Sequence, residues 1–218
     1  MKVLLIALWR NTMRFIELKE QLKNFTVFSL SDIRIISPRF HRRRLNDWQN
    51  KGYIKKIIRG YYVFSDFEIN ENVLFEIANR IYSPSYVSLE TALSYHGIIP
   101  EMVYGITSVS PKKTYGFTTY LGTFSYSSVK QSVFSGYELI KYANGRFFKI
   151  ACPEKAILDY FYIHTDLKTT ADFESIRFNK NVFLEKCRED NWYDLLEKFK
   201  QKRLNKRVKS FMEYMKNA

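Results

Sequence analysis

The chain has 218 residues, of which 46% are apolar and 26% are charged, and this composition argues against wholesale disorder. Its net charge of +13 indicates a polyanionic or an acidic protein partner. The excess is uneven: residues 1–66 carry 14 lysines and arginines against five acidic residues, residues 67–180 are neutral, and residues 181–218 carry a net +4. We therefore expect the charged binding surface mainly in the first third.

The N-terminus and the cysteines bear on where the protein resides. Val3 to Trp9 form an apolar run that is too short to span a bilayer and is followed by no small-residue cleavage site. We expect residues 1–12 to be an extension whose apolar run packs as a first turn; a signal peptide and a start at Met13 are the alternatives. Cys152 and Cys187 form no tight motif and are expected to be reduced, which predicts a cytoplasmic protein without a membrane partner.

Three helices are predicted in the first third of the chain. Apolar spacing predicts a helix from Met13, followed by a short β-prone segment at residues 25–28. A second helix would begin at Ser29 or Ser31. The third is predicted to begin at Ser37-Pro38, a capping residue followed by proline, and to end near Lys51 before Gly52.

The third helix is predicted to have an apolar stripe and a basic outward face. At 100° per residue, Phe40, Leu45 and Trp48 form the stripe. His41 and Arg44 fall within or beside that stripe. The residues predicted to face outward and contact DNA are Arg39, Arg42, Arg43 and Asn46.

A basic β-hairpin is predicted directly after the third helix. Ile54–Ile58 and Tyr61–Phe64 are rich in β-formers and are joined by Arg59-Gly60. Three helices and such a hairpin are the order of a winged helix-turn-helix, whose third helix enters the major groove. A solvated charged face and a protein-binding winged helix are the alternatives. The predicted DNA-binding residues of the hairpin are Lys55, Lys56 and Arg59.

The domain organisation is predicted as a winged helix-turn-helix at residues 1–66 and a larger α+β domain at residues 67–218, with a mainly antiparallel sheet and C-terminal helices. The α+β domain is expected to contain a linking helix, a second helix ending at Gly97, several strands, a hairpin around Asn144-Gly145 and a helix opening at Pro153. Two terminal helices are expected at 183–199 and 204–215. The basic segment at their junction is either a solvated face or a surface that binds an acidic partner or phosphates.

No catalytic, metal-binding or cofactor-binding motif occurs in residues 67–218, so we expect no metal, no cofactor and no enzymatic activity. Glu154, Lys155 and Asp159 suggest a metal-dependent nuclease as an alternative, although Glu154 and Lys155 would point about 100° apart on a helix. We expect Glu154 to complement a helix N-terminus and Lys155 to be exposed or ion-paired. His96 is expected to be a capping or packed residue.

Several segments resemble characteristic blocks of AbiEi antitoxins, a family also described as predicted transcriptional regulators of viral defence systems. The segments are YVSLETALSYHGIIPE, ITSVSPKK and FKIACPEKAILDYF, and the hairpin sequence RGYYVF also matches. In that family an "HGL"-like turn precedes a strand, and a "PE-(K/R)-x-L-L-D" block opens a helix. The corresponding residues here are His96 to Ile98 and Pro153 to Asp159. The resemblance covers about Phe15 to Ile163.

This resemblance implies a DNA-binding transcriptional autorepressor that is also the antitoxin of an AbiE-like type IV toxin–antitoxin system, active in abortive infection and phage defence. Its winged helix would bind repeats in its own promoter, as double-stranded DNA. Its C-terminal domain would counteract a nucleotidyltransferase-like toxin without a stable complex. The alternatives are a stand-alone regulator without a toxin and a nucleic-acid-processing enzyme that the winged helix directs to its substrate.

Overall fold

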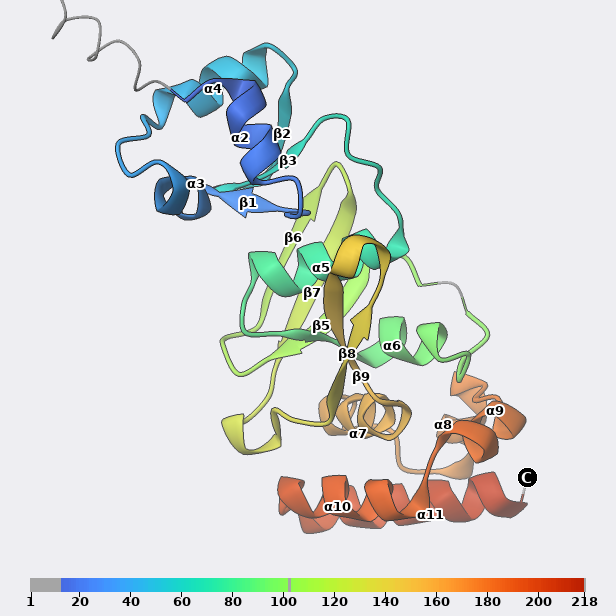
Figure 1. The fold of residues 1–218 in the computed structure, drawn as a ribbon. Coiled ribbons are helices and arrows are strands. Elements are labelled where there is room, and N and C mark those ends of the chain that lie inside the picture. The colour runs from blue at the N-terminus through green and yellow to red at the C-terminus, as the bar shows by residue number, and fades with distance from the viewer. Residues whose placement is uncertain (1–12, 102, 218) are drawn as a thin grey trace, which may run out of the picture. The chain divides into compact units, whose positions relative to one another are not determined.

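The computed structural model describes residues 13–101 and 103–217 (Figure 1). Its contacts divide the chain after Val73 into an N-terminal and a C-terminal unit, whereas the sequence placed the boundary after Asp66. The apolar extension, residues 1–12, lies outside the described residues. Across the described ranges, no helix combines the length and the apolar character needed to cross a membrane.

The N-terminal unit combines three helices with a three-stranded antiparallel sheet. Strand β3 is central and pairs with both β1 and β2. Helix α3 begins at the predicted cap, because the Asp32 backbone N–H donates to Ser29 Oγ at 3.3 Å and the Ser29 backbone N–H donates to the Asp32 carboxylate at 2.7 Å. The elements are α2 (Phe15–Gln21), β1 (Phe28–Ser29), α3 (Leu30–Ile36), α4 (Arg43–Asn50), β2 (Ile54–Ile58) and β3 (Tyr61–Phe64).

The third helix of this unit, α4, begins later than predicted. It starts at Arg43, and the Ser37-Pro38 pair that suggested a helix start lies in the preceding turn. The Ser37 backbone N–H donates to Ile33 O at 2.8 Å, so Ser37 closes α3. The Phe40 backbone N–H then donates to Ser37 O at 2.9 Å and forms a turn. The prediction of a helix beginning at Pro38 was therefore wrong.

The predicted end of α4 and the predicted hairpin are confirmed. Gly52 has φ +70°, a conformation that favours glycine, and its backbone N–H donates to Gln49 O at 2.9 Å. The Tyr53 backbone N–H donates to Trp48 O, also at 2.9 Å. These two bonds satisfy carbonyls that the last turn leaves open, so the chain leaves the helix directly into β2.

The C-terminal unit is an α+β arrangement, as predicted. Most of α5 belongs to it, and the division between the units falls inside this helix. The elements are α5 (Glu71–Ile81), β4 (Tyr86–Val87), α6 (Leu89–Tyr95), β5 (Ile106–Ser110), β6 (Tyr115–Thr119), β7 (Gly122–Ser128), η1 (Gln131–Val133), β8 (Tyr137–Lys141), η2 (Ala143–Gly145), β9 (Phe147–Ala151), α7 (Pro153–Ile163), α8 (Thr170–Ile176), α9 (Lys180–Lys186), α10 (Glu189–Phe199) and α11 (Lys202–Asn217).

The six strands of this unit form one sheet in the order β6-β7-β5-β4-β9-β8. Three of the five neighbouring pairs are antiparallel, in line with the predicted mainly antiparallel sheet, and β5–β7 and β4–β9 are parallel, so the sheet is mixed. In the hairpin of β6 and β7, the second strand, β7, pairs with β5, and these two strands run in the same direction. The hairpin β8–β9 likewise joins β4 through its second strand.

The centre of the sheet is narrow because β4 has only two residues, Tyr86 and Val87. Its pairing with β9 rests on the single register pair Val87–Ile150. Asn79 of α5 supplements this pairing: the Lys149 backbone N–H donates to Asn79 Oδ1 at 2.6 Å, and Asn79 Nδ2 donates to Lys149 O at 3.2 Å. A side-chain amide thus satisfies strand backbone next to the short β4.

Helices α7 to α11 gather at one end of this sheet (Figure 1), where α7 packs against α6, α10 and α11. Arg207 of α11 donates to Phe161 O and His164 O, both at 2.8 Å, and satisfies carbonyls at the end of α7. The helix predicted over 183–199 is broken into α9 and α10. The Arg188 backbone N–H donates to Glu154 Oε1 at 2.7 Å, which separates the two helices.

Candidate functional site

Helix α4 is oriented by apolar residues that bury one of its faces. Leu45 and Trp48 are 1% and 5% exposed, and Phe40, from the turn before the helix, is equally buried. The Trp48 ring lies 5.4 Å from that of Phe40 and 5.5 Å from that of Phe15, between centroids. These contacts hold the opposite face of α4 toward solvent.

The seven residues predicted to contact DNA are all exposed. Arg42, Arg43 and Asn46 line one open hollow of about 360 Å³ at the beginning of α4. Arg39 is not among its lining residues, and the other three lie apart on the hairpin, with Lys55 and Lys56 in β2 and Arg59 in the turn. The full lining of the hollow is Arg34, Phe40, His41, Arg42, Arg43 and Asn46.

Two residues differ from the helical-wheel prediction. His41 was expected within or beside the buried stripe, but it is exposed and lines the hollow. The wheel did not apply to it because the backbone before Arg43 is not helical. Arg44 does lie beside the stripe: it is half-buried, and its guanidinium lies 5.1 Å from the Trp48 ring centroid and 5.9 Å from that of Phe40.

Arg34 is a binding candidate that the sequence did not reveal. It is exposed in the last turn of α3, and the fold brings it to the start of α4. Spacing along α3 gave no indication of this proximity. Within the described residues, neither Arg34 nor the other cationic side chains of the hollow form an ion pair, and no carboxylate lines it.

The hairpin presents two consecutive lysines to solvent, although successive residues of a regular strand point to opposite faces. A bulge between Lys56 and Ile58 then changes the register of β2 against β3, so that Ile54 and Ile57, three residues apart, can both face the core. Ile54 and Ile57 are both buried, at 2% and 7% exposure, while Lys55 and Lys56 between them are exposed. Strand β2 is also the edge of its sheet and packs against α4.

In the C-terminal unit, a buried polar cluster surrounds Asp159 of α7. One carboxylate oxygen pairs with Lys155 Nζ, and the other accepts from Tyr86 OH at 2.9 Å and from Ser88 Oγ at 2.8 Å. The Lys155 and Asp159 side chains are 1% and 0% exposed. Lys155 is therefore ion-paired, one of the two predicted states. Burial, together with the nearby carboxylate, raises the pKa of Tyr86 well above its usual range.

The nuclease alternative needs Glu154 and Asp159 to be free for a cation. Both are buried, and Glu154 accepts the Arg188 N–H described above while Asp159 has both oxygens engaged. Among residues 13–101 and 103–217, no three His, Cys, Asp or Glu side chains are grouped to hold a metal ion. Cys152 and Cys187 are free thiols, and burial raises the pKa of Cys152 to about 12.

A partly exposed pair joins α6 to the end of α7. His164 Nε2 lies 3.4 Å from Glu90 Oε1, and the hydrogen bond that the imidazole donates to this carboxylate raises the pKa of His164 above its usual value. The Tyr160 ring lies 4.3 Å from the His164 ring, between centroids. Glu90 also has a side-chain hydrogen bond with Thr107, and its pair with His164 is a titratable contact between two helices.

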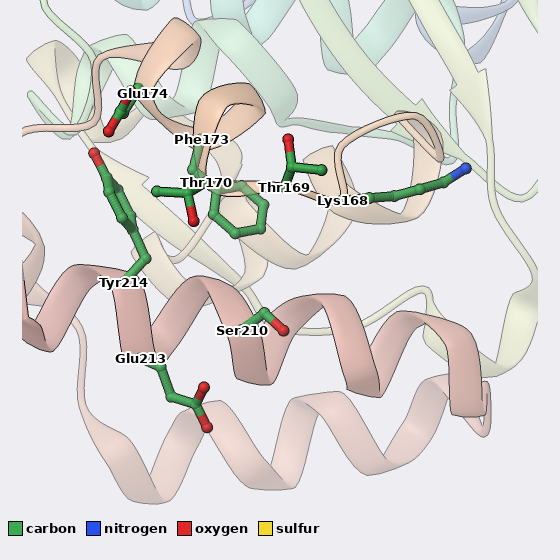
Figure 2. A pocket seen from close by; sticks show the side chains of 8 residues that line it. All are labelled: Lys168, Thr169, Thr170, Phe173, Glu174, Ser210, Glu213 and Tyr214. Atoms are coloured by element: carbon green, nitrogen blue, oxygen red, sulfur yellow. The ribbon is translucent and has the colours of Figure 1, made fainter.

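A second hollow, of about 720 Å³, lies between α8 and α11. Figure 2 shows its lining, in which the Phe173 ring lies between Thr170 and Thr169 while Glu174 and Tyr214 lie at one side. Thr169 is already used as a helix cap, because its Oγ1 accepts from the Asp172 backbone N–H at 3.3 Å. The hollow is lined by both signs of charge and favours no single ligand class.

Neither a protein-family model nor a curated protein matches this sequence. Of the surfaces described above, the basic face of α4 with its hollow and the neighbouring hairpin is the one with a consistent chemical character.

Proposed function

We propose that the N-terminal unit is a winged helix-turn-helix that binds double-stranded DNA, and that the protein is a transcriptional autorepressor. The order of helix, short strand, two helices and hairpin supports this proposal, as does the antiparallel sheet formed by β1, β2 and β3. In this proposal α4 lies in the major groove, and the turn between β2 and β3 contacts the DNA backbone.

The observation that carries the proposal is the contrast between the two sides of α4. Leu45 and Trp48 hold one side in the core, while Arg42, Arg43 and Asn46 stand exposed around one hollow. Arginine and asparagine are residue types that bind base edges bidentately, guanine and adenine respectively. Asp47, the exposed acidic residue of α4, is not among the residues that line the hollow, so no carboxylate within its lining neutralises these cations.

We further propose that the C-terminal unit is the antitoxin domain of an AbiE-like type IV system and counteracts a nucleotidyltransferase-like toxin without a stable complex. The support is the resemblance of three sequence blocks. Two of them meet in the fold: His96 Nε2 lies 2.8 Å from Ala151 O, and Asp159 binds the residues on and after β4. A stand-alone regulator with the same DNA-binding role is the outcome if no toxin gene accompanies it.

A gel-shift titration tests the DNA-binding proposal. The probe is the DNA directly upstream of the gene, with random DNA as competitor and salt varied. We expect a specific shift that weakens steeply with salt, because phosphate binding releases counterions. Arg43→Ala should cost about 1–3 kcal/mol of discrimination if Arg43 reads bases. Equal affinity for upstream and random DNA would refute repression and leave a protein-binding winged helix.

The antitoxin half needs a separate test in cells. Co-expression of this chain with a neighbouring nucleotidyltransferase-like toxin gene should restore the growth that the toxin inhibits. The Arg42→Ala/Arg43→Ala double variant should restore growth equally, because it leaves the C-terminal unit intact. Loss of rescue in that variant would show that neutralisation depends on DNA binding. Failure of the wild-type chain to restore growth would remove the antitoxin proposal and leave the repressor proposal standing.

A further inference from the structure

We propose that the hollow at the start of α4 is a clamp for one backbone phosphate of the DNA, with Arg34 and His41 as binding residues alongside Arg42. This inference rests on the proposed function and assigns different DNA contacts to different residues of the N-terminal unit. The clamp would fix the position of α4 on the duplex, while Arg43 and Asn46, on the helix itself, would remain for base edges.

The charge of the hollow is the first support. Three arginines and a histidine line it, contributed by the end of α3, the turn and the start of α4. No carboxylate is among the lining residues, and the cations have no ion pair within the part of the chain that the structure describes. Cationic side chains that come from separate elements to one hollow, with no carboxylate among the lining residues, can bind the oxygen atoms of a polyanion.

The shape of the hollow is the second support. It is open to solvent, and its apolar lining residue is Phe40, which is 5% exposed and belongs to the core. A ligand pocket for a small molecule is usually enclosed and largely apolar. An open, basic hollow of about 360 Å³ instead admits a phosphodiester together with the chain that continues on both sides of it.

The delayed start of α4 is the third support. The N–H groups of Arg44 and Leu45 donate to His41 O at 3.1 Å and Arg42 O at 3.0 Å. The N–H groups of Arg42 and Arg43 donate to no other residue among those described, so they are available at the positive end of the helix. A helix starting at Pro38 would have used these groups internally.

The clamp predicts a distinct effect on DNA binding. Arg34→Gln should weaken binding to upstream and random DNA by similar factors and make the plot of log affinity against log salt shallower by about 1. Base preference should stay the same. Asn46→Ala should do the opposite, with a change in base preference and an unchanged salt slope.

The decisive experiment uses inorganic phosphate as the probe, at constant ionic strength, and follows backbone and arginine Nε resonances of the full chain by NMR. We expect the resonances of Arg34, His41 and Arg42 to shift together with one dissociation constant. Arg34→Gln should weaken that constant about tenfold, the loss of one charge-assisted hydrogen bond. Lys51→Gln is the matched control, since it removes one exposed charge at the opposite end of α4.

The outcomes separate the clamp from the proposed function. Shifts scattered over exposed lysines and arginines, with Arg34→Gln and Lys51→Gln behaving alike, would overturn the clamp. A specific upstream gel shift whose salt slope is unchanged by Arg34→Gln would also overturn it, while the repressor proposal would stand. Phosphate binding in the hollow without selective DNA binding would support the clamp and remove the repressor.

Discussion

Removal of the Asp159 carboxylate should destabilise the C-terminal unit severely. Asp159→Ala leaves Lys155 Nζ charged and buried, and it takes the acceptor from Tyr86 OH and Ser88 Oγ. Loss of one partner from a buried ion pair costs about 3–5 kcal/mol, and two unsatisfied hydroxyls place this variant toward the upper end. Asp194→Ala, an exposed carboxylate in the same unit, should stay within about 0.5 kcal/mol of wild type.

A second pair of variants tests whether the charge is responsible. Lys155→Met leaves the Asp159 carboxylate buried but with both hydroxyl donors, so its loss should fall toward the lower end of that range. The double variant Lys155→Met/Asp159→Asn removes both charges, and the amide oxygen can still accept from the hydroxyls. We expect its loss of unfolding free energy to be smaller, by about 1–3 kcal/mol, than the sum of the losses of the single variants Lys155→Met and Asp159→Asn.

The measurement is urea unfolding followed by the fluorescence of Trp192, which is 1% exposed in the C-terminal unit. A background without the other two tryptophans restricts the signal to this unit. A loss below about 1 kcal/mol for Asp159→Ala would refute the reasoning, because it would lie close to the roughly 0.5 kcal/mol that mutation of an exposed residue can give. Strictly additive losses for Lys155→Met and Asp159→Asn would show that the buried charges do not stabilise each other.

Three further predictions concern local features. Gly136→Ala should destabilise the C-terminal unit clearly more than Gly145→Ala in thermal unfolding. Both glycines have positive φ, of +77° and +72°, so both variants are strained. An added Cβ at Gly136 would also lie 2.7 Å from the Leu195 side chain, whereas Gly145 faces open space. Ser29→Ala should cost about 1 kcal/mol in the N-terminal unit, through loss of the α3 cap, and a loss near zero would contradict the capping role. Glu90→Gln should lower the thermal midpoint at pH 6 but much less at pH 8. The raised pKa of His164 gives stability that is present below about pH 6.5 and is lost as pH rises through the folded-state pKa of His164. An equal effect at both pH values would contradict the pairing of His164 with Glu90.

Features with a local cause were predictable from the sequence. Gly52 ends α4, Asn144-Gly145 joins β8 to β9, and Pro153 opens α7, each as expected. In each case a residue type with special backbone requirements determines the conformation of its neighbours. The bounds of the β2–β3 hairpin followed from β-forming residues on both sides of Arg59-Gly60.

Features with a non-local cause were not predictable. Ser37-Pro38 has the local pattern of a helix start, but the burial of Phe40 against Trp48 and the bond from Ser37 to Ile33 impose a turn there. The parallel pairing of β4 with β9 joins residues more than 60 positions apart. Arg34 became a candidate for the site because tertiary packing, not sequence spacing, places it beside the start of α4.

The two-residue strand β4 has a consequence for how the C-terminal unit opens and closes. The strands on either side, β5–β7 and β8–β9, are each built from contiguous chain and can exchange amide hydrogens as separate cooperative blocks. Strand β4, held by the Tyr86 and Ser88 bonds to Asp159, pairs with both blocks and couples them within the sheet. Asp159 belongs to the segment that begins with Pro153 and opens α7. Loss of its bonds to Tyr86 and Ser88 should therefore let one block of strands unfold while the other persists.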